Sequence, residues 1–176
     1  MKRCLIPFLF LFFLALSVSG VLSEEQKQSE LKITSPVFEN NSDIPRRYAC
    51  DGKNISPPIE IKNVPPQVKT LALTIDDVDA PRGTYVHWIL WNIDPMVREI
   101  KEDSVPEGAV QGTNDFKKHP YKGPCPPSRA HRYIFKVFAL DRRLDLSPDS
   151  TKTDLQKAIK GHVIAEAQLV GRYKKK

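Results

Sequence analysis

The sequence contains few of the residue patterns that organise catalytic or metal-binding sites. Its 176 residues include three cysteines and four histidines. No Gly-x-Ser-x-Gly elbow, His-Glu-x-x-His arrangement or zinc-finger spacing occurs. Basic residues form no stripe interleaved with aromatic side chains, as a nucleic-acid interface would require. We therefore expect no nucleophilic enzyme of a known motif class, no nucleic-acid partner and no cofactor.

Long helical patterns are also scarce, because fifteen prolines and eight glycines divide the chain into short pieces. One short helix is expected at residues 153–160, with Gly161 at the position that follows its end. Apolar and β-branched segments predict strands at residues 31–33, 36–38, 70–75, 85–93, 131–140 and 165–173. The sequence therefore predicts a mostly β protein, with antiparallel sheets packed as a β-sandwich or compact barrel and one or two short helices.

The N-terminal segment differs in composition from the rest of the chain. A basic start at residues 1–3 is followed by an almost unbroken apolar run at 5–16 and then by small residues. This order is typical of a secretory signal peptide, and the run is shorter than the about 20 residues of a membrane span. We predict a signal peptide at 1–23 that is removed on export to the periplasm or the cell exterior. Residues 24–30 would then be a flexible segment and 31–176 a single domain. An uncleaved N-terminal membrane anchor is the alternative.

Two cysteines remain after removal of the leader, which contains Cys4. Two thiols in an exported chain predict one disulfide, here between Cys50 and Cys125. The alternative is a pair of independent loop cysteines, since the sequence does not show that the two are adjacent.

The C-terminal tail carries much of the basic excess, at Arg172 and at residues 174–176. A solvated terminus explains such a tail most simply. The functional alternative is a weak, salt-sensitive contact with a membrane surface that contains anionic lipids.

Asp77 and His87 are expected to lie at the same end of the sheet. Asp77 follows one predicted strand and His87 lies near the start of the next, so antiparallel pairing would bring the two ends together. A carboxylate near an imidazole fixes the tautomer of the ring and favours its charged form. The alternative is structural, because Asp77-x-Asp79 before Pro81 is also a pattern that shapes turns.

His131 and Tyr133 extend this group of polar residues. Both begin the clearest predicted strand and lie on the same face of it, two residues apart. The preceding loop contains Gly123 and Pro124, where glycine permits close approach of the backbone and proline stiffens the chain. Two histidines, a carboxylate, a tyrosine hydroxyl and a rigid loop are suited to a small oxyanion, to which imidazolium and backbone N–H groups would donate.

These residues occur in an order that resembles the phosphatidylethanolamine-binding protein family. Asp77-x-Asp79-Ala80-Pro81 precedes His87, and Gly123-Pro124 with Pro126-Pro127 precedes His131-Arg132-Tyr133. The bacterial and archaeal branch, often called Raf-kinase-inhibitor-like proteins, also has segments similar to residues 50–58, 114–116 and 161–163. The resemblance extends over residues 31–173.

The resemblance implies a β-sandwich-like fold with a small anion pocket. In the family this pocket takes phosphate or a phosphoryl headgroup, and the matching positions here are Asp77, His87, Gly123, His131 and Tyr133. It also implies a cis peptide before Pro81, which an Ala-Pro bond permits. Lys117 stands where bacterial members commonly have glycine, and we expect it to make the pocket rim more basic or simply to be exposed.

Three functional hypotheses follow. The first is a binding protein, not an enzyme, that recognises a phosphate, phosphoryl or carboxylate group and acts as an inhibitor or modulator of a partner protein. The second is a metal-dependent hydrolase with Asp77, His87 and His131 as ligands. The third hypothesis, which the family resemblance implies, is an inhibitor of an extracytoplasmic protease.

Overall fold

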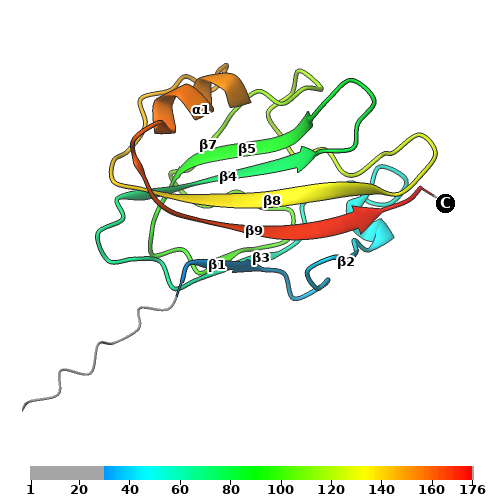
Figure 1. Ribbon diagram of the computed structural model, residues 1–176, viewed down its shortest axis with the longest axis horizontal. Coiled ribbons are helices and arrows are strands. Elements are labelled where there is room, and N and C mark those ends of the chain that lie inside the picture. Colours follow the sequence, from blue (N-terminus) through cyan, green and yellow to red (C-terminus); the bar gives the residue numbers. More distant parts are fainter. Residues whose placement is uncertain (1–29, 176) are drawn as a thin grey trace, which may run out of the picture.

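The computed structural model describes residues 30–175, in which strands predominate (Figure 1). The long strands are β4, β5, β8 and β9, and the one α-helix of the described chain is α1. The elements are β1 (Lys32–Thr34), β2 (Ser42–Asp43), the 3-10 helix η1 (Arg46–Tyr48), β3 (Ile59–Lys62), β4 (Thr70–Asp77), β5 (Tyr85–Ile93), β6 (Glu99–Ile100), β7 (Val110–Gln111), β8 (His131–Leu140), α1 (Lys152–Ile159) and β9 (Val163–Tyr173). The predicted mostly β class is confirmed.

Two sheets form the layers of this β-sandwich-like fold. The large sheet has the strand order β2-β9-β8-β4-β5-β7, and the small sheet has the order β1-β3-β6. Neighbouring strands pair antiparallel, except that β2 runs parallel to β9. Figure 1 shows the small sheet on one face of the large sheet and α1 on the other. The long strands are thus covered on both sides.

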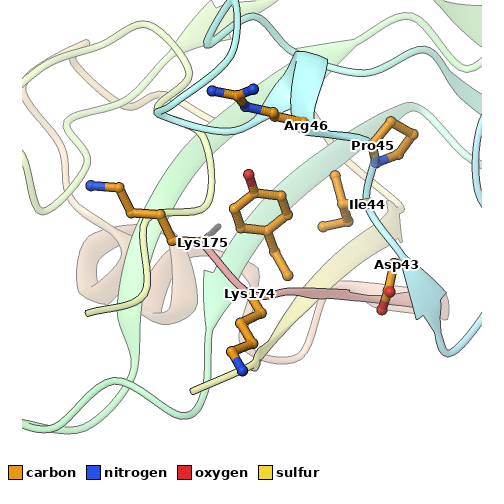
Figure 2. A pocket seen from close by; sticks show the side chains of 7 residues that line it. Asp43, Ile44, Pro45, Arg46, Lys174 and Lys175 are labelled. Carbon is orange, nitrogen blue, oxygen red and sulfur yellow. The ribbon is translucent and has the colours of Figure 1, made fainter. Parts of the chain in front are cut away.

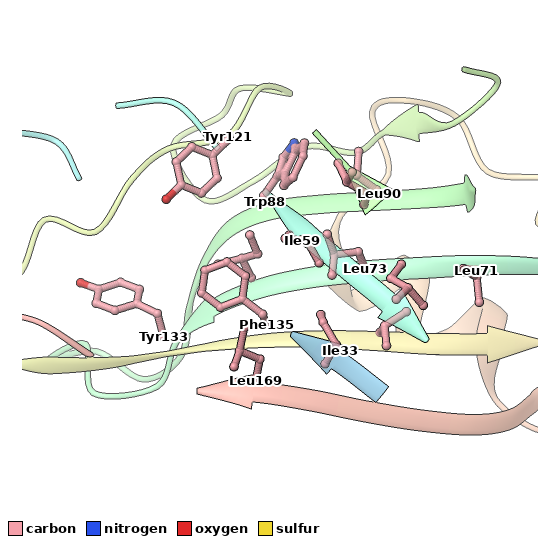
Figure 3. Packing of buried hydrophobic residues seen from close by; sticks show 14 of the residues in the cluster. Ile33, Ile59, Leu71, Leu73, Trp88, Leu90, Tyr121, Tyr133, Phe135 and Leu169 are labelled. Carbon is pink, nitrogen blue, oxygen red and sulfur yellow. The ribbon is translucent and has the colours of Figure 1, made fainter. Parts of the chain in front are cut away.

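This double cover explains the composition of the central strands. Every residue of β4 is buried, so the strand reads as an apolar run without alternation. Trp88 and Trp91 lie on opposite faces of β5, as their spacing requires, and both are buried. Trp88 packs in the core between the sheets, with Leu73 and Phe135 (Figure 3). Trp91 packs in the second core, beneath α1.

Local signals determine both ends of α1. A capping box joins the side chains and backbone of Thr151 and Asp154 at its start. Gly161 follows its end with a φ of 81°, a left-handed conformation that glycine adopts without strain. The helix buries Leu155 on the sheet, and its Lys152 Nζ lies 2.8 Å from the carboxylate of buried Asp76. The predicted helix at 153–160 is confirmed to within one residue.

The strand predicted at residues 36–38 is wrong. Pro36 has no N–H to donate to a neighbouring strand, and the N–H of Val37 donates instead to the Ser35 hydroxyl at 3.4 Å. That hydroxyl in turn donates to the carbonyl of Pro58 at 2.7 Å. The segment is therefore a bend, although Phe38 still reaches the core.

No helix in residues 30–175 has the length and apolar character needed to cross a membrane. The predicted signal peptide and the alternative membrane anchor fall in residues 1–29, outside the described part of the chain.

Candidate functional site

The strand register brings four of the predicted site residues together at one end of the large sheet. Asp77 on β4 lies opposite Tyr133 on β8 and opposite Tyr85 on β5. His131 is two residues from Tyr133 on β8, so these two share a face. His87 lies where the β4–β5 register shifts by one residue, and its ring packs 6.0 Å from that of Tyr85 and 5.2 Å from that of Tyr133. Asp77, His87, His131 and Tyr133 are each at most 5% exposed. These four side chains are therefore almost completely shielded from solvent.

Asp77 holds His131 in place. The Nδ1 atom of His131 lies 2.8 Å from Asp77 Oδ2, and both side chains are buried. A carboxylate only accepts, so Nδ1 of His131 carries the hydrogen. The other carboxylate oxygen, Oδ1, accepts the N–H of Asp79 at 2.9 Å. Asp77 thus shapes the turn after β4 and also orients a histidine.

His87 has a different partner from the one its sequence position suggests. Its Nδ1 lies 2.6 Å from the backbone carbonyl of Lys122, and this contact determines its tautomer. Its ring centroid lies 5.2 Å from those of Phe116 and Tyr133. Burial lowers the pKa of His87, although the Lys122 carbonyl and the Asp77 charge act in the opposite direction. The expectation that a nearby carboxylate makes His87 readily charged is wrong, because desolvation outweighs the carboxylate.

Tyr133 supplies a hydroxyl at the centre of this cluster. Figure 3 shows its ring near the start of β8, in line with Phe135. The hydroxyl oxygen is fully buried and makes no hydrogen bond of normal distance and angle among the described residues, although the Asp77 carboxylate and the backbone of Cys125 lie close to it. Burial, and then the nearby Asp77 charge, raise the pKa of Tyr133, so the hydroxyl keeps its proton and remains a donor.

A disulfide between Cys50 and Cys125 joins two loops next to this cluster, which confirms the predicted bridge. The N–H of Cys50 also donates to the carbonyl of Pro124 at 3.0 Å. A Cβ atom on Gly123 would lie 2.2 Å from the carbonyl oxygen of Tyr48. Glycine is therefore required here because the loop packs on the chain's own backbone, whereas the sequence suggested close approach to a ligand.

The turn after β4 corrects the expectation at Pro81. No cis peptide occurs in the described residues, so the Ala80–Pro81 bond is trans. The N–H of Gly83 donates to the carbonyl of Ala80 at 3.1 Å and closes a β-turn. A trans proline already has the φ that the second position of such a turn needs.

Asn114 is a site residue that sequence reasoning missed as an individual residue. It is 1% exposed, and its Oδ1 accepts the N–H groups of Phe116 and Lys118. Its Nδ2 donates to the carbonyl of His87 at 3.3 Å. It therefore ties the 114–118 loop to β5. The sequence signal for Asn114 was the segment at residues 114–116, one of those that resemble the bacterial and archaeal branch of the family.

Lys117, in the same loop, has a φ of 60°. This left-handed conformation costs a residue with a Cβ about 1–2 kcal/mol, and glycine avoids the cost. The side chain of Lys117 is exposed.

A cavity of about 540 Å³ is lined by residues 43–46 and by residues 173–175 at the end of β9. Its floor includes Tyr173, which is the cross-strand neighbour of His131. Figure 2 shows Ile44 and Pro45 on one side of it and Lys175 on the other. Asp77, His87 and His131 do not line this cavity.

The cluster does not form a metal site. Within residues 30–175, no three or more His, Cys, Asp or Glu side chains are arranged to hold a metal ion together. The metal-dependent hydrolase with Asp77, His87 and His131 as ligands therefore finds no support in the geometry.

The fold and the cluster define a class, a β-sandwich-like protein with paired histidines at one end of its large sheet. The family model described as phosphatidylethanolamine-binding protein matches residues 34–174. The chain therefore belongs to the phosphatidylethanolamine-binding protein family.

Proteins of archaea and bacteria are similar to this chain. UPF0098 protein PH1269 of Pyrococcus horikoshii is 44% identical over 183 residues, which cover 99% of this chain and 91% of that protein. The crystal structure of the phosphatidylethanolamine-binding protein homologue CT736 of Chlamydia trachomatis is 39% identical, with a TM-score of 0.81 over 84% of this chain and 99% of that one. Escherichia coli YbcL is 30% identical, with a TM-score of 0.79 over 84% of this chain and 100% of that one.

Proposed function

We propose that this protein binds a small oxyanion, a phosphate, phosphoryl or carboxylate group, at the cluster of Asp77, His87, His131 and Tyr133. The observation that carries the proposal is the hydroxyl of Tyr133, which is fully buried and lacks a partner among the described residues. A buried donor without an acceptor is unfavourable, so a ligand oxygen at this position gains a bond that the protein alone does not make.

The two histidines support the same proposal. Each uses Nδ1 within the protein, on Asp77 or on the Lys122 carbonyl, so each ring has a fixed orientation before any ligand arrives. In both rings Nε2 makes no hydrogen bond within residues 30–175. Neither Nε2 atom is fully buried. Preoriented groups bind at a lower entropic cost than mobile ones.

We further propose that the protein acts outside the cytoplasm, after loss of residues 1–23. The order of basic, apolar and small residues at the N-terminus supports this, as does the disulfide between Cys50 and Cys125. A role as modulator of a partner protein would use the same site, with the partner presenting the anionic group. No structural observation favours protease inhibition over this role.

Titration with inorganic phosphate and with phosphoethanolamine tests the anion site. We expect the imidazole NMR signals of His87 and His131 to shift in a saturable manner, while the signal of His162 stays in place. His162 is a suitable internal control because it is bound to Asp141, at 2.9 Å, in the turn between α1 and β9. Unchanged signals for His87 and His131 in both titrations would refute the proposal.

A further inference from the structure

The hydrogen-bond partners of His87 determine which of its nitrogens can donate. A backbone carbonyl only accepts, so the contact of 2.6 Å with Lys122 places a hydrogen on Nδ1. In the neutral ring Nε2 then has a lone pair and acts as an acceptor. The ring is 3% exposed, and burial lowers its pKa below the ordinary value. At neutral pH His87 therefore presents an acceptor to a ligand.

The charged groups around His87 are mainly acidic. Asp76 and Asp77 act on it from β4 and Asp115 from the loop after β7, and each raises the pKa of His87 by less than burial lowers it. Tyr85 on its own strand, Phe116 and Tyr133 are neutral aromatic neighbours. Lys122 contributes its backbone carbonyl.

Asp77 adds a second acceptor to the cluster. Its carboxylate is occupied by His131 Nδ1 and by the N–H of Asp79, but its negative charge remains close to any ligand. Donors come from the Tyr133 hydroxyl and, in the charged form of His131, from Nε2. A ligand that fits this mixture of acceptors and donors has both bare oxygens and a hydroxyl.

We propose that the site selects oxyanions that carry a proton of their own, namely phosphate and phosphomonoesters in their protonated forms. This inference rests on the proposed anion-binding function. The ligand hydroxyl donates to Nε2 of His87, and a bare ligand oxygen accepts from Tyr133. Sulfate and phosphodiesters have no proton at neutral pH, so they meet the lone pair of His87 and the charge of Asp77 without compensation. When two hydrogen-bond acceptors face each other with no proton between them, binding is unfavourable. This penalty is an effective source of specificity.

The proposal has a consequence for lipids. The phosphate of an intact glycerophospholipid is a diester and has no hydroxyl, so its headgroup fits this site poorly. A phosphomonoester, such as phosphoethanolamine released from a lipid, meets the requirement.

Four probe anions test the proposal by calorimetric titration: inorganic phosphate, methyl phosphate, sulfate and dimethyl phosphate. Hydrogen phosphate and sulfate form a matched pair, since both are tetrahedral dianions and they differ by one proton. At pH 7.5 we expect phosphate to bind at least tenfold more tightly than sulfate. At pH 6, where methyl phosphate retains its proton in part, it should likewise bind more tightly than dimethyl phosphate.

The pH dependence provides a second measurement on the unaltered protein. Burial lowers the pKa of His87, so its ring becomes charged only at a pH below the usual range for histidine. In the charged ring Nε2 carries a hydrogen and is a donor. Sulfate affinity should then rise about tenfold per pH unit as the pH falls toward the folded-state pKa. Phosphate keeps a hydroxyl throughout this range, so its affinity should change much less.

The variant His87→Gln removes the fixed acceptor and offers an amide that can donate. We expect the preference for phosphate over sulfate to fall below threefold, whereas His162→Gln, far from the site, should keep it. Equal affinity of the unaltered protein for phosphate and sulfate, with no pH dependence for sulfate, would overturn this inference and leave the anion site intact. Absence of binding for all four anions would overturn the proposed function and the inference with it.

Discussion

At the scale of single residues, Tyr133 is the point where binding and stability conflict. Its ring packs fully in the core between the sheets, while its hydroxyl lacks a partner among the described residues. A buried polar group without a hydrogen bond costs about 1–3 kcal/mol. Local destabilisation of this kind is common where a protein keeps a group ready for a ligand.

The variant Tyr133→Phe separates the two effects. It keeps the ring and removes the unpartnered hydroxyl, so we expect the free energy of unfolding to rise by about 1 kcal/mol. Phosphate affinity should fall about tenfold, because one charge-assisted hydrogen bond is lost. Urea unfolding and calorimetric titration measure the two quantities.

Tyr121→Phe is the matched control, because the hydroxyl of Tyr121 is buried but donates to the Tyr48 carbonyl at 2.9 Å. Its loss should lower the free energy of unfolding by about 1 kcal/mol, opposite in sign to the change at Tyr133. Destabilisation by Tyr133→Phe with unchanged phosphate affinity would show that Tyr133 is only a packing residue.

At the scale of elements, the ends of β4 and β8 are joined by an ion pair. Asp79 follows β4, and its carboxylate accepts bonds from the Arg132 guanidinium at 2.7 and 2.9 Å. It also accepts the backbone N–H of Arg132 at 2.9 Å. This clamp holds the start of β8, where His131 lies, against the strand that carries Asp77. It therefore holds together the two strand ends that carry the cluster.

The variant Asp79→Asn should reveal this clamp in the pH dependence of stability. The Arg132 guanidinium holds the pKa of Asp79 well below its usual range. A carboxyl with a lowered folded-state pKa stabilises the protein above its unfolded-state pKa, and the effect is lost as the pH falls through the folded-state pKa. Since Arg132 is largely exposed, we expect a loss of at most about 1 kcal/mol at pH 7.

Urea unfolding at neutral and at acidic pH measures the difference between Asp79→Asn and the unaltered protein, which should shrink as the solution becomes acidic. Asp43→Asn is the control. Its side chain is 84% exposed and lies 3.7 Å from Arg172, so its effect should stay within about 0.5 kcal/mol. An effect of Asp79→Asn that is the same at every pH would exclude the ion pair as its cause.

At the scale of the whole molecule, the disulfide joins distant parts of the chain. Cys50 and Cys125 are 75 residues apart in sequence, and the bridge ties the loop that contains η1 to the loop before β8. A cross-link over such a long segment restricts the unfolded chain and stabilises the folded protein by about 4 kcal/mol in the loop-entropy model. Disulfides persist mainly in oxidising compartments, so the bridge is consistent with the proposed export.

We predict that protein recovered outside the cytoplasm lacks residues 1–23 and contains the disulfide. Intact mass spectrometry should show the loss of the leader, and a gain of two hydrogens on reduction. Urea unfolding of the reduced protein should show a free energy of unfolding lower by about 4 kcal/mol. A full-length mass in the membrane fraction would favour the N-terminal anchor instead.

Strand positions and the helix were predictable from sequence, because their signals are local. The apolar run of β4, the alternation in β8 and the glycine after α1 each act over a few residues. The strand predicted at residues 36–38 is absent because local groups also act there. Pro36 has no N–H to donate, and the N–H of Val37 donates to the Ser35 hydroxyl, despite the apolar composition of the segment. The short strands β2, β3, β6 and β7 depend on pairing partners far along the chain, and no local pattern revealed them.

The sequence by itself predicted that Asp77 and His87 lie at one end of the sheet and that His131 and Tyr133 share a face of one strand, because antiparallel pairing and strand alternation are local rules. The family resemblance joined the two pairs into one site. Only the tertiary structure decided which of them bond. Asp77 pairs with His131 and not with His87, whose partner is a carbonyl 35 residues away. The protonation of His87, and with it the proposed choice of ligand, follows from burial by loops packed over the sheet, a quantity that no local pattern encodes.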